Sequence, residues 1–89
     1  MAVCLIFEGP GMTEAEYEQV RNEVAGDGPP PGALYHVAGP TEDGWCVVEV
    51  WESPEALKRF TDEKLLHALE RAGVAARPRV FEVATIIQP

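Results

Sequence analysis

The sequence has few cysteines, few basic residues and no long apolar run. Only Cys4 and Cys46 are present, without a Cys-x-x-Cys pair, so neither a disulfide framework nor a structural zinc site is indicated. Seven Lys and Arg stand against fifteen Asp and Glu, which gives a net charge of −8. Because an anionic polymer or surface repels such a chain, we expect no nucleic acid and no membrane among its partners.

No segment has the pattern of an export signal or a membrane span. The apolar opening Ala2–Phe7 is short, lacks a basic flank and runs directly into Glu8, Gly9 and Pro10. Two unpaired thiols suit a reducing compartment, so we expect a cytoplasmic protein. The 89 residues, 46% hydrophobic and 25% charged, provide for one globular core. We therefore expect a single domain spanning 1–89.

The first part of the chain predicts a strand and then a helix. The run Ala2–Glu8 is rich in strand formers and is closed by glycine and proline, which favours a strand with two apolar faces. Thr13 and Glu16 have the spacing of a capping box, and apolar residues at helical spacing follow as far as Gly26. The proline-rich stretch Asp27–Gly32 continues neither element and predicts a stiff connector.

A hairpin and a final strand follow. Ala33–Gly39 and Trp45–Glu52 are β-branched and aromatic runs separated by the turn formers Pro40–Gly44, which is typical of a hairpin. Near the end of the chain, Arg77–Arg79 contains a proline and predicts a break. Val80–Ile87 then has the composition of the last strand.

The second helix is expected between Ser53 and Gly73. Ser53 is a suitable N-cap before a proline at the first helical position, and Gly73 is a suitable end. The apolar spacing slips between Phe60 and Leu65, and Thr61–Glu63 can cap a new start. Two interpretations stay open: one helix, or two short helices with a bend.

The element order βαββαβ predicts an α+β, ferredoxin-like fold with a four-stranded antiparallel sheet and both helices on one face. The strands are apolar on both sides: Leu5 and Phe7 alternate with Cys4 and Ile6. The face without helices is therefore apolar too. Natural proteins cover such a patch by burying about 800 Å² per partner, so we expect a homodimer that packs sheet against sheet.

The stretch from Pro31 to Phe60 resembles the dimeric α+β barrel proteins grouped with the antibiotic-biosynthesis monooxygenases. Its most specific parts are His36-Val-Ala-Gly-Pro40 and Val50-Trp-Glu-Ser53, and the element order agrees over nearly the whole chain. The resemblance implies two ferredoxin-like sheets paired into a barrel, with a small organic molecule between sheet and helices. The activities it implies are cofactor-independent oxygenation of aromatic polyketides and related cyclisation or isomerisation.

A heme-degrading branch of the same superfamily needs an Asn in the first strand, a Trp in the second helix and a heme-ligating His. The first strand has no Asn, Phe60 stands at the Trp position, and His67 is off the expected spacing. His36, His67 and the scattered carboxylates show no metal-ligand spacing. We therefore expect no cofactor and no metal ion.

His36 and Glu49 are the candidate catalytic residues. His36 lies among apolar residues in a predicted strand, where an imidazole can accept a proton, and Glu49 is a carboxylate in the middle of the next strand. With a four-residue loop of 41–44, the register pairs His36 with Glu49 on the same face as Val47 and Trp51. A loop of odd length sends the two side chains to opposite faces, and a paired His and Glu could equally fix a dimer interface.

Four aromatic residues are candidates for binding an apolar or aromatic ligand. Tyr17 and Tyr35 can donate a hydrogen bond to a substrate oxygen, while Trp51 and Phe60 can form an apolar wall. The plainer alternative is that all four belong to the core. The two functions that remain are an enzyme acting on an aromatic molecule and a non-catalytic binding or dimerisation module. A cavity of a few hundred cubic ångströms reached by polar groups favours the enzyme.

Overall fold

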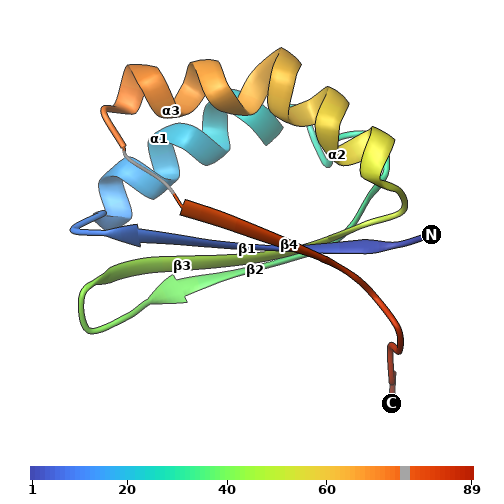
Figure 1. Cartoon of the computed structure of the whole chain (residues 1–89). Helices are drawn as coiled ribbons and strands as arrows, with labels where there is room; N and C mark the ends of the chain where they lie inside the picture. The colour runs from blue at the N-terminus through green and yellow to red at the C-terminus, as the bar shows by residue number, and fades with distance from the viewer. Residues whose placement is uncertain (75–76) are drawn as a thin grey trace.

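The computed structural model describes residues 1–74 and 77–89. Its strands form one antiparallel sheet in the order β2-β3-β1-β4, and all helices cover the same face of that sheet (Figure 1). This confirms the ferredoxin-like α+β fold. In chain order the elements are β1 (Val3–Pro10), α1 (Glu14–Ala25), β2 (Ala33–Pro40), β3 (Gly44–Trp51), α2 (Pro54–Phe60), the π-helical turn η1 (Thr61–Leu65), α3 (Leu66–Ala72) and β4 (Arg77–Glu82).

The first helix begins where the capping box predicts. The Thr13 hydroxyl accepts from the backbone N–H of Glu16 at 3.2 Å, and the Glu16 carboxylate accepts from the backbone N–H of Thr13 at 2.9 Å. The strand before it is longer than expected, because Gly9 and Pro10 still pair with the start of β3. The turn into α1 is therefore anchored on both sides.

The hairpin has the four-residue loop. Pro40 pairs with Trp45, and the ends of the loop are joined by the bond from the Thr41 N–H to the Gly44 carbonyl at 2.9 Å. This register places His36 directly opposite Glu49. The even-loop interpretation is confirmed, and the two side chains share one face of the sheet.

The slip in the second helix is a π-helical turn that joins two short helices, α2 and α3, so Thr61–Glu63 continues the helical backbone and does not cap a new start. Thr61–Leu65 joins α2 to α3 without interruption, and the N–H of Leu66 bonds to the carbonyl of Thr61. Among the residues that the structure describes, no side chain caps the start of this turn. A π turn bonds each residue to the fifth along the chain, so it restores Phe60 and Leu65 to one face although they are five residues apart.

The last strand is shifted from the expected Val80–Ile87 to Arg77–Glu82. β4 lies at the edge of the sheet, where the missing N–H of Pro78 leaves no ladder bond unmade, so proline does not break the strand. At the other end the pairing with β1 ends at Val3 and Glu82, and one more bond follows, from the N–H of Val83 to the carbonyl of Ala2 at 2.9 Å. The strand therefore ends before the isoleucines of the tail.

The core lies between the sheet and the helices. Alternate residues of β1 and β3 point toward the helices and are buried there, whereas their neighbours point to the open face. In the described part of the chain, every helix is too short or too polar to cross a bilayer. The core side chains are Val3, Leu5, Phe7, Met12, Val20, Val24, Val47, Trp51, Leu57, Phe60, Ala68 and Leu69.

Glycine is required at position 44, where the hairpin packs against the turn before α1. A Cβ on Gly44 would overlap the carbonyl oxygen of Gly9 and lie 2.7 Å from the amide nitrogen of Gly11. We predict that Gly44→Ala lowers the free energy of unfolding by about 1–3 kcal/mol in urea denaturation. Gly39→Ala is the matched control, because a Cβ there meets no atom of the described residues within 4 Å. Equal effects of the two changes would contradict this account.

Candidate functional site

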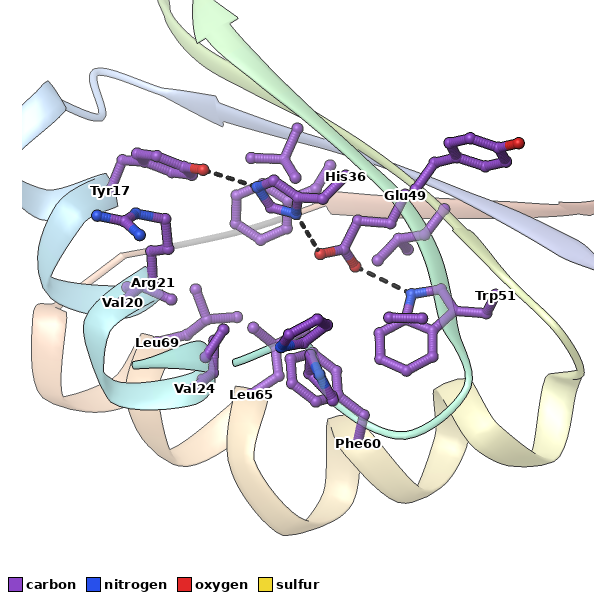
Figure 2. Close-up of a pocket in the computed structure, with 18 of the residues that line it drawn as sticks. Tyr17, Val20, Arg21, Val24, His36, Glu49, Trp51, Phe60, Leu65 and Leu69 are labelled. Atoms are coloured by element: carbon purple, nitrogen blue, oxygen red, sulfur yellow. Dashed lines mark hydrogen bonds and ion pairs between the residues drawn. The ribbon is translucent and has the colours of Figure 1, made fainter. Parts of the chain in front are cut away.

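A cavity of about 350 Å³ lies between the sheet and the helices (Figure 2). Its walls are mainly apolar side chains from both layers, and its volume falls in the range of small-molecule sites. The prolines of the stiff connector, Pro29 and Pro30, contribute to the lining. The apolar walls include Leu5, Phe7, Val20, Val24, Val47, Trp51, Phe60, Leu65 and Leu69.

A chain of hydrogen bonds crosses one wall of this cavity. The Tyr17 hydroxyl lies 2.6 Å from Nε2 of His36, and Nδ1 of His36 lies 2.9 Å from Oε2 of Glu49. The other carboxylate oxygen, Oε1, accepts a bond from the indole N–H of Trp51 at 3.1 Å. Helix α1 and strands β2 and β3 thus contribute to one network, which Figure 2 shows as dashed lines.

The direction of these bonds follows from the carboxylate. Ionised Glu49 can only accept, so Nδ1 of a neutral His36 ring carries the proton and donates it. Nε2 then has a lone pair, and the Tyr17 hydroxyl donates to it. Glu49 therefore fixes the orientation of the His36 ring, and the lone pair of Nε2 faces the Tyr17 hydroxyl.

Glu49 is the more buried member of the pair. Its side chain is 14% exposed, whereas that of His36 is 42% exposed. Burying a carboxylate is costly unless donors replace the lost water, and His36 and Trp51 supply one donor to each oxygen. Both partners are needed, because the loss of either leaves one oxygen without its donor.

The phenol of Tyr17 is held in its neutral form. Burial raises its pKa above the usual value near 10, and the negative charges of Glu18 and Glu49 raise it further, while Arg21 opposes them. A neutral phenol retains its proton and remains a donor. This agrees with the direction of the bond to Nε2 of His36.

Aromatic rings hold both ends of the network. Tyr17 stacks on Trp45 with ring centroids 5.3 Å apart, and Trp51 packs on Phe60 at 4.8 Å. The indole nitrogen of Trp45 is buried and has no hydrogen-bond partner among the described residues. The Tyr17 ring is therefore positioned by stacking as well as by its hydroxyl.

The structure brings five of the six predicted site residues into this network and its packing. His36 and Glu49 pair as the even loop predicts, Tyr17 and Trp51 extend the pair, and Phe60 packs on Trp51. Tyr35 also contributes to the lining. However, it follows the opposite alternation of β2 and pairs with Val50, so it lies apart from the hydrogen-bonded chain.

Sequence reasoning missed the Tyr17–His36 bond and the presence of Arg21 in the cavity lining. Arg21 lines the cavity one helical turn after Tyr17, and the spacing of four residues is a signal that could have placed it beside Tyr17. The bond between Tyr17 and His36 depends on how α1 packs on the sheet, which no local spacing encodes. Within the described residues, no three His, Cys, Asp or Glu side chains gather as metal ligands.

No protein-family model matches the sequence, and no curated protein matches it. Solved structures do match over nearly the full length. A single-residue mutant of SnoaB, a cofactor-independent oxygenase from Streptomyces nogalater, superposes with a TM-score of 0.71 at 15% identity, covering 99% of this chain and 97% of its own. The chain has the fold of the antibiotic-biosynthesis monooxygenases.

Two further structures support this fold assignment. A protein from Chloroflexus aurantiacus, assigned to the antibiotic-biosynthesis monooxygenases, matches with a TM-score of 0.70 at 20% identity, covering 99% of this chain and 98% of its own. ActVA-Orf6 of Streptomyces coelicolor, a monooxygenase in complex with nanaomycin D, matches with a TM-score of 0.61 at 18% identity, covering 99% and 91%. The resemblance noted in the sequence is thereby confirmed for the monooxygenase fold.

Proposed function

We propose that this protein binds a small aromatic molecule and oxygenates it without a cofactor, starting with removal of a substrate proton. The observation that carries the proposal is the Tyr17–His36–Glu49–Trp51 chain in the wall of an apolar cavity of about 350 Å³. SnoaB and ActVA-Orf6, which share the fold, are an oxygenase and a monooxygenase. In this proposal residues 1–89 form one domain, and its cytoplasmic location stays a prediction.

The proton acceptor is Nε2 of His36. A substrate proton reaches it through the Tyr17 hydroxyl, which takes that proton as its own passes to Nε2 across the 2.6 Å bond. The imidazolium that forms is stabilised by Glu49 at 2.9 Å, and Trp51 keeps the carboxylate in place. Tyr17 and His36 are the catalytic residues of this proposal, and Glu49 and Trp51 are positioning residues.

The oxygenation step needs a substrate whose carbanion is stabilised by aromatic rings and a carbonyl group. Loss of a proton from a CH₂ group of such a ketone gives an enolate, which transfers electrons to O₂ and combines with it as a peroxide. Loss of water then leaves a new carbonyl, so CH₂ and O₂ become C=O and H₂O. Dioxygen is the only oxidant required.

We predict that His36→Gln lowers kcat by about 10²- to 10⁴-fold, because the proton acceptor is lost. The assay follows O₂ uptake with a panel of anthrones and polycyclic phenols. It also follows deuterium incorporation at the substrate carbon without O₂, which isolates proton transfer. The matched control is His67→Gln, because His67 is the only other histidine and is exposed on α3.

Oxygen uptake that survives His36→Gln unchanged in a folded protein would overturn the mechanism. Wild-type protein that binds the panel but accelerates neither reaction would favour the non-catalytic binding module instead. Exchange without oxygen uptake would support proton transfer and point to a cyclase or isomerase.

We also propose that the protein is a homodimer that packs through the open face of the sheet. That face carries apolar side chains in register: Val37 opposite Val48, and Tyr35 opposite Val50. Val37 is 65% exposed and Phe81, on the same face, is 51% exposed. An apolar patch of this kind is typical of an interface between protein chains.

We predict that the wild-type protein elutes and scatters light as a dimer at micromolar concentration, and that Val37→Glu makes it monomeric by placing a charge in the interface. Leu66→Glu is the control, because it adds the same charge at an exposed apolar residue of α3. A monomeric wild type, or a dimer that tolerates Val37→Glu, would contradict the proposed interface.

A further inference from the structure

One charged side chain of the cavity lining has no part in the proposed mechanism. Among the described lining residues, Arg21 is the only one with a permanent positive charge. Four of the other polar lining residues, Tyr17, His36, Glu49 and Trp51, already form one hydrogen-bonded chain. Arg21 therefore lies outside the Tyr17–His36–Glu49–Trp51 hydrogen-bonded chain, and we consider a separate function for it.

The guanidinium of Arg21 has donors to spare. Its Nη2 bonds the Glu18 carboxylate at 2.7 Å, and the two side chains are 44% and 45% exposed. An ion pair exposed to this degree is weak, so a ligand can share or replace it at little cost. Guanidinium carries five N–H donors in a planar fork that matches a carboxylate. Arg21 can thus donate hydrogen bonds to an anionic group while it remains close to Glu18.

The two charges of the cavity fix the orientation of such a ligand. In Figure 2, Arg21 lies beside Tyr17, on the side of the cavity opposite Trp51, whose indole binds Glu49. An anion near Glu49 would be repelled by its charge, whereas the Arg21 side attracts it. The apolar body of the ligand then extends toward Trp51 and Phe60, where the walls are aromatic.

The overall charge makes this arginine more significant. The protein carries a net charge of −8, so an anionic ligand is disfavoured at most of its surface. A site that takes an anion in such a protein needs a local cation. Arg21 is that cation, and it lies within the cavity lining.

We propose that Arg21 is a specificity-determining residue which binds the carboxylate of an otherwise apolar aromatic ligand. The cavity then prefers an aromatic acid to the neutral compound of the same shape. This inference rests on the proposed function, because it assumes that the cavity is the ligand site.

The test uses two ligands of matched shape, 2-naphthoate and 2-naphthalenemethanol, titrated into the full chain by calorimetry. We expect the wild-type protein to bind the acid about tenfold more tightly than the alcohol, with a preference that shrinks as salt is added. Arg21→Gln should abolish this preference by weakening the acid alone, while Arg21→Lys should retain part of it. Arg59→Gln is the matched control, since it removes one positive charge from an exposed residue outside the cavity.

Equal affinity for acid and alcohol in the wild type, or an equal loss of both in Arg21→Gln, would overturn the role of Arg21 and leave the proposed function intact. If Arg59→Gln lowers the preference for the acid as much as Arg21→Gln does, the preference comes from the overall charge of the protein. This outcome would also overturn the role of Arg21. If neither compound binds the wild type, the cavity is not a site for aromatic ligands, which contradicts the proposed function itself.

Discussion

The register of the β2–β3 hairpin is the constraint on which the candidate site depends. Because side chains alternate along a strand, a shift of one residue would turn His36 and Glu49 to opposite faces. The loop of four residues between Pro40 and Trp45 sets that register. Gly44 holds the loop against the turn before α1, so the same contact that fixes the hairpin also fixes the start of the helix that carries Tyr17.

Burial of one carboxylate organises the rest of the network. Glu49 is mostly shielded from water, and each of its oxygens receives one hydrogen bond, from His36 and from Trp51. The cost of an unpaired buried charge keeps both donors in place. The orientation of the imidazole, and with it the nitrogen that faces Tyr17, therefore follows from the requirements of Glu49. The result is an imidazole nitrogen held in one orientation in the wall of an apolar cavity.

The parts of the fold that local rules govern could be predicted from the sequence. The capping box of Thr13 is a local signal, and it correctly predicted the start of α1. The length of the β2–β3 loop is local too, and a four-residue loop correctly predicted the pairing of His36 with Glu49. The end of β4 depends on how far β1 extends as its partner, so the composition of 80–87 was misleading. The contact of Tyr17 with His36 depends on how α1 packs on the sheet, which local sequence does not encode. The slip between Phe60 and Leu65 fitted either one helix or two short helices with a bend, so the π-helical turn could not be predicted from it.

The most direct test of this account is the protonation state of the His36 ring. In the His67→Gln variant, His36 is the only histidine, so ¹⁵N NMR of its imidazole can be assigned without ambiguity. At a pH where the ring is neutral, we predict a proton on Nδ1 and a lone pair on Nε2, with both signals changed by Glu49→Gln. A proton on Nε2 instead would leave Glu49 without its donor from His36, and would contradict the hydrogen-bonded chain from which the function is inferred.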